Sequence, residues 1–265
     1  ALMSCTTGAS NTAIGYGALD AHTTNDQNTA IGVNALGAST TGETNTAVGY
    51  NAGGGVTTAY RSVFIGNGAL QGVTTGLRNT ACGYGTGGTA GATAEKNTLV
   101  GAECDVSASD SNNQVVLGWD CTGSGNATIT CGEGTVDSTL SFGGTTWSAP
   151  SDVRMKEEVE TSTAGLGFIN DLRPVTFKWK KEKDIPEELV THKADSEKRY
   201  KNDTVNHGFI AQEVKEVIDN HPEIKEGFDM WTEDEKDGRQ RVGASALEIV
   251  LTKAIQELSA KVEDL

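Results

Sequence analysis

The hexapeptide NTAIGY at Asn11–Tyr16 returns in register along the first half of the chain. It recurs as NTAIGV at 28–33, NTAVGY at 45–50, SVFIGN at 62–67, NTACGY at 79–84, NTLVGA at 97–102 and QVVLGW at 114–119. The glycine of each motif, here called the anchor glycine, falls at 15, 32, 49, 66, 83, 101 and 118, so the spacing is 17 with a single 18. A fixed short period predicts structural units that stack on one another.

Each repeat carries a short apolar stretch of strand length, followed by Gly, Asn and Thr, which favour turns. A helix is disfavoured, because every glycine in a helix interior costs about 1 kcal/mol. We therefore predict an all-β shaft, a β-helix or β-roll, over residues 1–150. The repeats occupy 11–121, and a tail rich in Gly, Thr and Ser occupies 122–150.

Stacking the repeats about 4.8 Å apart places equivalent positions above one another. The position four residues before the anchor glycine is Asn in five of the seven repeats, and an asparagine ladder satisfies amide groups between rungs. One aliphatic side chain per rung makes a thin core, so we expect several copies of the chain to share it around an axis. The residues directly before the anchor glycines form this aliphatic ladder: Ile14, Ile31, Val48, Ile65, Cys82, Val100 and Leu117.

The cysteines have a structural interpretation. Cys104 and Cys121 take the third position after their anchor glycines, where earlier repeats hold Ala or Thr. They are most simply small buried residues, and a disulfide between adjacent rungs is the alternative. No CxxC or Cys/His spacing supports a metal site, and no motif indicates a cofactor.

Composition divides the chain near residue 150. Residues 1–150 hold 27 of the 33 glycines but only three of the 21 basic residues, whereas 151–265 hold 26 of the 36 acidic residues. Two domains, 1–150 and 151–265, are therefore predicted. The formal charge of −15 argues against a nucleic-acid partner, which needs basic patches. No run of about 18 apolar residues indicates membrane insertion.

Four separated motifs of the second half resemble, in order, the intramolecular chaperone auto-processing domain that ends many phage tailspikes and tail fibres. They are SDVRMK at 151–156, INDLRPVTFKW at 169–179, HGFIAQEV at 207–214 and the closing helix at 247–265. The repeats resemble, less specifically, the head repeats of trimeric adhesins and the shafts of phage fibres. The resemblance implies an α+β chaperone domain on a homotrimeric fibre of the virion. It also implies assembly in the host cytoplasm and loss of the chaperone from the mature particle.

The same resemblance implies a self-cleaving serine endopeptidase with a Ser-Lys dyad. Residue by residue, Ser151 matches the nucleophile and Lys156 matches the base, and the scissile bond is Pro150–Ser151. A serine hydroxyl is a weak nucleophile until a neighbouring base takes its proton. Lysine takes that proton only as a neutral amine, which requires removal from water or a nearby cation.

Three further side chains are expected to support this chemistry. Arg154 is the cation that favours a neutral lysine, and Asp152 orients either Lys156 or Arg154. His207 acts as a second base, or as a structural residue that caps the following helix. An unrelated hydrolase site built on Glu213 or on the acidic run 233–235 is the competing enzyme hypothesis, although most charge runs are solvated loops.

The last segment has the seven-residue spacing of a coiled coil. Its two seams are Leu251, Leu258 and Leu265, then Leu247, Ala254 and Lys261, widened by Ile255 and Val262. Three such helices would bundle and hold three chains in one register. Besides these copies of itself, the resemblance implies upstream tail proteins and a host glycan or protein receptor as partners. Residues 180–206 are highly charged without periodicity, which predicts a long exposed arm.

The sequence alone leaves three functions open. The first is a phage tail fibre whose chaperone trimerises and folds the shaft and then cuts itself off. The second is a structural adhesin shaft with a non-cleaving trimerisation cap. The third is a eukaryotic membrane-tethered transcription factor with a similar self-cleaving domain, which needs a DNA-binding domain and a membrane span. The shaft is either a passive spacer or a receptor-binding surface, and no aromatic cluster or carboxylate pair singles out a carbohydrate site.

Overall fold

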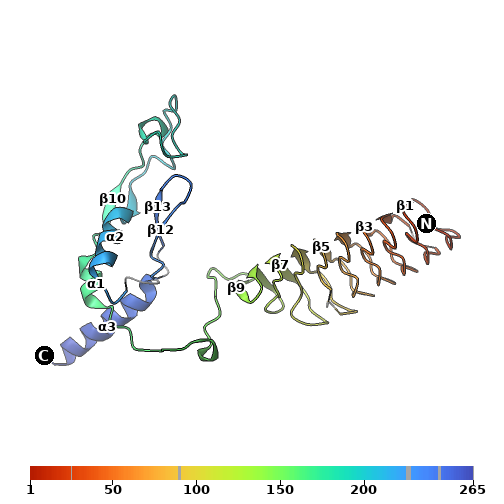
Figure 1. Cartoon of the computed structure of the whole chain (residues 1–265), viewed down its shortest axis with the longest axis horizontal. Helices are drawn as coiled ribbons and strands as arrows, with labels where there is room; N and C mark the ends of the chain where they lie inside the picture. Colours follow the sequence, from red (N-terminus) through yellow and green to blue (C-terminus); the bar gives the residue numbers. More distant parts are fainter. Residues whose placement is uncertain (25, 89–90, 225–227, 244–245, 265) are drawn as a thin grey trace. The chain divides into compact units, whose positions relative to one another are not determined.

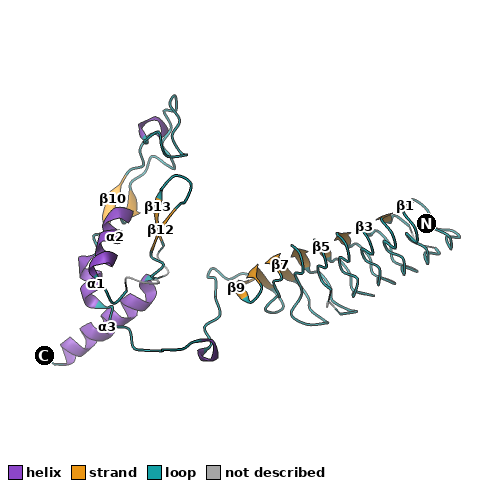
Figure 2. Cartoon of the chain, viewed as in Figure 1, coloured by secondary structure: helices purple, strands orange, loops and turns teal. Residues whose placement is uncertain are grey.

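The computed structural model of the chain describes residues 1–24, 26–88, 91–224, 228–243 and 246–264. The chain divides into two compact units, Ala1–Glu157 and Glu158–Leu265, and each is described by itself. The first unit consists of strands and turns, and the second mixes helices with short strand pairs (Figure 1, Figure 2).

The first unit is a β-solenoid whose strands form one sheet in chain order (Figure 1). Strands β1 to β8 are parallel, and β9 returns antiparallel to β8. Thr12 lies opposite Thr29, so one 17-residue repeat makes one coil, and the predicted β-helix is confirmed. The strands are β1 Thr12–Ile14, β2 Thr29–Ile31, β3 Thr46–Val48, β4 Val63–Ile65, β5 Thr80–Cys82, β6 Thr98–Val100, β7 Gln114–Trp119, β8 Thr128–Glu133 and β9 Val136–Ser141.

The sheet continues beyond the predicted repeats. Gly132 lies opposite Gly118, so β8 adds one more rung after a shorter coil. β9 then folds back as a hairpin, which covers the edge that β8 would otherwise leave unpaired. Ser148 in turn pairs with Thr139 of β9. The tail predicted at 122–150 is therefore folded almost to its end.

The solenoid core differs from the predicted one. Side chains alternate across a strand, and the inward position is the second residue before the anchor glycine, not the first. The aliphatic ladder is in register as predicted, but it lies outside, and Ile14 is 59% exposed. The ladder therefore does not form the core of a single chain, and its predicted sharing between copies stays a prediction. The buried residues at the inward position are Ala30, Ala47, Phe64, Ala81, Leu99 and Val116.

The third and fourth residues after the anchor glycine complete the core. They include Ala18, Ala35, Ala52 and Ala69, and Leu19, Leu36 and Leu70, all buried. Cys104 and Cys121 take the third position, where they are buried and free. Burial raises the pKa of Cys121 to about 11 and also raises the pKa of Cys104. Both are therefore the small core residues that were predicted, and they form no disulfide.

The predicted asparagine ladder is confirmed, with a repeated bonding pattern. Asn28 Oδ1 accepts the backbone N–H of Asn45 at 3.0 Å, and its Nδ2 donates to the Gly42 carbonyl at 2.8 Å. Asn45 bonds in the same way to Ser62 at 3.0 Å and to Ala59 at 2.8 Å. Each buried amide thus joins its own rung to the next, which satisfies backbone groups that would be costly to leave unpaired.

The anchor positions require glycine for two reasons, the backbone conformation and the lack of room for a side chain. At Gly66 φ is +131°, where L side chains are strained. A Cβ added there would lie 2.1 Å from the carbonyl oxygen of Gly83 in the next rung. The close stacking of rungs therefore depends on the missing side chain.

We expect Gly66→Ala to destabilise the shaft by about 2–4 kcal/mol, because backbone strain and the clash with the next rung act together. Gly125→Ala is the matched control, since an added Cβ at Gly125 meets nothing within 4 Å. Denaturant unfolding of both variants measures the difference. Equal midpoints for the two would contradict the steric account.

The second unit confirms the predicted α+β class. Its helices are α1 Leu166–Asp171, α2 Ala211–Asn220 and α3 Leu247–Glu263. Its antiparallel pairs are β10 Val175–Phe177 with β11 Asn206–Gly208, and β12 Trp231–Glu233 with β13 Gln240–Val242, and η2 Glu182–Asp184 is a 3-10 turn. The buried core is Ala164, Phe168, Leu172, Val214, Ile218, Ile224, Met230 and Val250.

One side of helix α3 packs against the rest of the second unit, and another side is exposed. Val250 and Ala254 are buried, and Glu257 Oε2 accepts the backbone N–H of Leu166 in α1 at 2.9 Å. The seam containing Ala254, predicted to face other copies, therefore lies on the side of α3 that packs within its own chain. Leu265 of the other seam lies outside the described residues. The α3 stripe is defined here as the exposed residues Leu251, Ile255, Leu258 and Val262.

The charged segment 180–206 is an exposed arm, as predicted, but it is folded on itself. Lys181 and Arg199 form a bridge between its two limbs. Glu197 binds the amines of Lys181 and Lys183. Hydrogen bonds from these two lysines lower the pKa of Glu197 to about 2. These three charges are thus paired within the arm.

His221 connects helix α1 to the turn after α2. One ring nitrogen lies 2.9 Å from Glu223 Oε1 and the other 2.9 Å from Asp171 Oδ2. Hydrogen bonds to Glu223 and then Asp171 raise the pKa of His221 above its usual value. The folded second unit therefore favours the protonated imidazole.

We expect the second unit to lose on the order of 1 kcal/mol of stability as pH rises from about 6 to about 8. The His221 contribution is fully present below the unfolded pKa and disappears as pH passes the higher folded pKa. The loss is small because Asp171 is well exposed. Urea titrations at both pH values measure it, with His221→Gln as the variant that removes this component. An identical loss in that variant would assign the pH dependence to other groups.

Candidate active site

The segment that leaves the shaft is anchored on one side and exposed on the other. Ser148 and Thr139 of β9 exchange two backbone hydrogen bonds of 2.8 Å each. The chain then leaves the sheet at Pro150, and residues 150–157 are exposed except for Asp152, which is half-buried. The predicted scissile bond therefore lies on an accessible segment just after the last anchored residue of the shaft.

One short 3-10 turn, η1 Val153–Met155, forms the site. Asp152 caps it, because its carboxylate accepts the backbone N–H of Arg154 at 2.9 Å. The backbone N–H of Lys156 donates to the Val153 carbonyl at 3.1 Å and closes the turn. Such caps satisfy the unpaired N–H groups at a helix start. The Ser-Asp pair thus has a local structural reason besides any chemistry.

The turn brings the two predicted dyad residues into contact. Lys156 Nζ donates a hydrogen bond to Ser151 Oγ at 2.6 Å. This is the reach expected between a nucleophile and its base. Ser151 also directly follows Pro150, so its hydroxyl belongs to the residue that supplies the nitrogen of the predicted scissile bond.

Asp152 and Arg154 bind each other. Arg154 Nε lies 3.0 Å from both carboxylate oxygens of Asp152. Hydrogen bonding between them raises the pKa of Arg154 and lowers the pKa of Asp152. The Arg154 charge, expected to favour a neutral lysine, is therefore compensated in the single chain. Of the two orienting roles expected for Asp152, the structure shows the contact with Arg154.

His207 lies exposed on β11, opposite Thr176 of β10. It does not cap helix α2, whose N-cap is Ile210 with no side-chain hydrogen bond. The pairing of β10 with β11 instead joins the second and third motifs of the family pattern.

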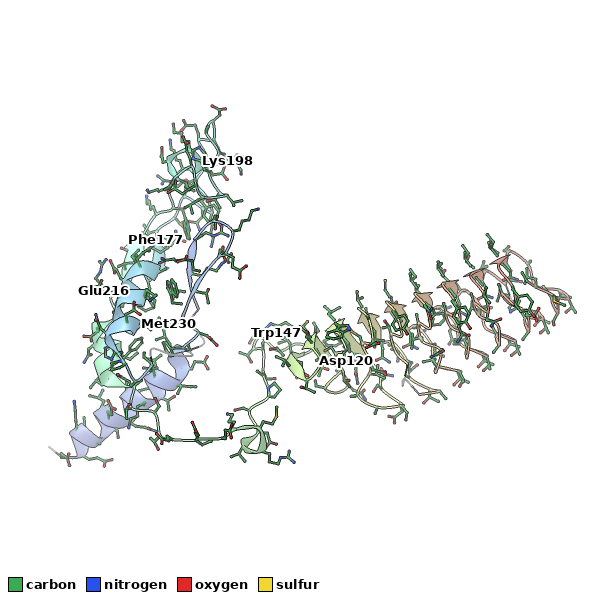
Figure 3. All side chains as sticks on the ribbon, in the orientation of Figure 1. Asp120, Trp147, Phe177, Lys198, Glu216 and Met230 are labelled. Atoms are coloured by element: carbon green, nitrogen blue, oxygen red, sulfur yellow. The ribbon has the colours of Figure 1, made fainter. Side chains whose placement is uncertain are left out.

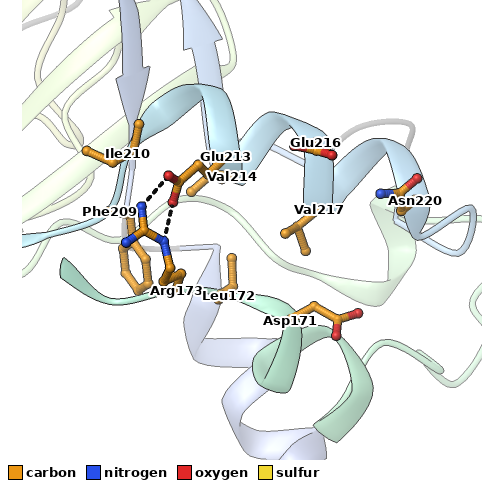
Figure 4. Close-up of a pocket in the computed structure, with 10 residues that line it drawn as sticks. All are labelled: Asp171, Leu172, Arg173, Phe209, Ile210, Glu213, Val214, Glu216, Val217 and Asn220. Carbon is orange, nitrogen blue, oxygen red and sulfur yellow. Dashed lines mark hydrogen bonds and ion pairs between the residues drawn. The ribbon is translucent and has the colours of Figure 1, made fainter.

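A cavity of about 290 Å³ lies beside α2 and is lined in part by Arg173 and Glu213 (Figure 4). Arg173 Nε donates to Glu213 Oε2 at 2.9 Å, and this hydrogen bonding lowers the pKa of Glu213. Asp234 of the acidic run is likewise bound by Arg239 and Arg241. These carboxylates of the competing hydrolase hypothesis are thus held ionised in ion pairs, which does not suit a general acid.

The shaft carries an exposed aromatic column at the position after the anchor glycines. Tyr16, Tyr50, Tyr84 and Trp119 each follow an anchor glycine, and all four are exposed. Side chains project in rows from the strands of the sheet (Figure 3). Because these residues are 34 or 35 positions apart, they recur in every second repeat. The residue after each anchor glycine, compared across repeats, is the signal that reveals the column.

Within the described ranges, no three His, Cys, Asp or Glu side chains gather into a metal site. No described helix has both the length and the apolar character of a membrane span.

The fold and this segment define a repeat-built β-solenoid that leads through an exposed Ser-Lys turn into an α+β unit. Residues 151–221 match the family model Chaperone of endosialidase, Peptidase S74. The match begins at Ser151, the predicted nucleophile, and ends at His221. The match supports a phage tail fibre with a C-terminal chaperone domain. Comparisons with curated proteins and with solved structures gave no match.

Proposed function

We propose that this chain is the C-terminal part of a phage tail fibre or tailspike whose residues 151–265 trimerise and fold the shaft and then cut at Pro150–Ser151. The 2.6 Å contact between Lys156 Nζ and Ser151 Oγ, at the start of the family match, carries this proposal. The shaft remains in the virion after assembly in the host cytoplasm, joined to upstream tail proteins and directed to a host receptor. The released domain is absent from the particle.

The cut is an acyl transfer followed by hydrolysis. Neutral Lys156 takes the proton of Ser151 Oγ as that oxygen attacks the carbonyl carbon of Pro150. The C–N bond breaks, the proton passes to the nitrogen of Ser151, and an ester joins Pro150 to Ser151 Oγ. Water then hydrolyses the ester. The shaft ends in the carboxylate of Pro150, and the chaperone begins with the free amine of Ser151.

The exposure of the site gives a physical reason for the cut to follow assembly. Ser151 and Lys156 are both exposed in the single chain, and water favours the protonated amine. Packing of neighbouring copies around the junction would remove the amine from water and produce the neutral base. Cleavage removes the folding aid, and the finished fibre then cannot easily unfold, so its stability is kinetic.

Trimerisation is assigned to the α3 stripe. Identical rungs permit slipped pairing, so three shafts need a device that sets their register. The stripe is apolar and exposed, with the spacing of a coiled-coil seam. Joining three copies there raises the local concentration of the shafts, which speeds an otherwise slow association.

Comparison of the whole chain with a chain that ends at Pro150 tests the chaperone role. We expect the whole chain to give soluble trimeric shaft and the short chain to give at least about tenfold less, because it lacks the register device. Light scattering of the soluble fraction measures the trimer. Equal yields of trimeric shaft from the two chains would contradict the proposal.

A further inference from the structure

We propose that the outer face of the solenoid sheet is the surface through which the shafts of three copies pack against one another. This inference rests on the proposed trimeric fibre and adds where the shafts meet. It starts from the aliphatic ladder that the fold leaves outside its own core. The outer face is defined as the residues three before, one before and one after each of the seven anchor glycines.

The outer face is continuous along the shaft. In β7, Leu117 and Trp119 are two residues apart in one strand, so their side chains lie on the same face. Backbone hydrogen bonds carry both columns from rung to rung: Gly32 N–H to the Ile14 carbonyl at 2.7 Å and Asn34 N–H to the Tyr16 carbonyl at 2.8 Å. The same pair of bonds links the rungs that follow.

The chemistry of the face is that of a protein interface. None of the residues of this face carries a formal charge, although the shaft as a whole is acidic. The column before the anchor glycines is Ile, Val, Leu and one Cys, and the column after them contributes three Tyr and one Trp. Aromatic side chains are enriched and charged ones depleted at the centre of protein interfaces. A glycan site would instead need convergent polar groups, which the aliphatic column lacks.

The size of the face also exceeds what a monomer exposes. Ten of its large apolar side chains are between 37% and 82% exposed. Their exposed surface is on the order of 1,000 Å² per chain, since an aromatic side chain alone carries about 150–250 Å². Monomers rarely expose more than a few hundred Å² in one apolar patch, and a stable interface takes about 800 Å² from each partner. The area therefore fits burial against further copies of this chain.

Cys82 provides a native probe, because it belongs to the aliphatic ladder and is exposed in the single chain. The oligomeric state of the uncut full chain with Ser151→Ala is first measured by light scattering. It is then treated with a polyethylene-glycol maleimide, and modification of Cys82 is followed by peptide mass spectrometry. The matched control adds Thr58→Cys, at an exposed position of a coil turn away from this face. We expect Cys82 to react at least about tenfold more slowly than the control thiol, since reaction requires an accessible thiolate.

A trimer in which Cys82 reacts as fast as the control thiol would overturn the inference and leave the proposed function intact. It would mean that the face is free to meet a receptor. A monomeric chain would overturn the proposed trimer itself. A second comparison uses Ile65→Lys on the face and Thr58→Lys off it. The outward Ile65 side chain lies outside its own core, so the coil should still fold. We expect the Ile65→Lys shaft to dissociate and the Thr58→Lys shaft to stay trimeric, and two stable trimers would count against the face.

Discussion

A chain with Ser151→Ala will remain a single polypeptide of 265 residues, whereas the unaltered chain will run as two pieces on a denaturing gel. Removal of the nucleophile leaves no oxygen to attack the Pro150 carbonyl, so the cut should slow by at least about 10³-fold. Lys156→Met should have the same effect, because Ser151 loses the group that takes its proton.

Two exposed residues supply controls for folding and for charge. Ser148→Ala removes a hydroxyl near the junction, and Lys236→Met removes an exposed lysine in the turn after β12. Both chains should cut as the unaltered one does. Light scattering must show that the uncut variants are still trimers. Cleavage in the Ser151→Ala chain would assign the nucleophile to another residue.

Charges on the α3 stripe should abolish assembly. The double variant Ile255→Glu, Leu258→Glu would bury two carboxylates without partners between the α3 helices of neighbouring copies. This costs about 3–5 kcal/mol or more. We expect a monomeric chain by light scattering. We also expect little cut product, because the junction stays in water.

The matched control places the same two charges on another side of α3. Gln256→Glu, Ala260→Glu changes residues that are exposed and outside the stripe. This chain should form trimers and cut normally. A trimeric Ile255→Glu, Leu258→Glu chain would show that register is set by another surface.

The repeat predicts the architecture of the shaft but not which side faces inward. The 17-residue period predicts the length of a coil, the position of its strand and the stacking of Asn28 on Asn45. The period does not predict which side chains point into the core, because either side of a strand with alternating residues can be buried. Residue size does not reveal the facing either, because the inward position holds Ala30 in one rung and Phe64 in another, while the aliphatic Ile31 and Ile65 are left outside.

The turns of the coil are also hidden in the sequence. Five residues before each anchor glycine the backbone takes a positive φ without any glycine, as at Thr44 and Arg61 with 58° and 57°. Left-handed backbone at such residues is uncommon, so composition does not reveal these turns. Hydrogen bonds between rungs hold the conformation.

At the site, the sequence predicts residue types and the fold supplies their contacts. The family pattern points to Ser151 and Lys156, and the η1 turn then accounts for their meeting across five positions. The pairing of Asp152 with Arg154 has no sequence signal that separates it from a contact with Lys156. The exposure of the whole segment likewise depends on how the chain leaves Ser148.

The intact masses of the purified, unaltered protein test the central claim most directly. The account predicts two species, residues 1–150 and residues 151–265, the second beginning Ser151-Asp152-Val153-Arg154. A trimeric protein with the single mass of the uncut chain would contradict self-release and support a shaft with an inert trimerisation cap. Two species with a different junction would contradict the assignment of Ser151.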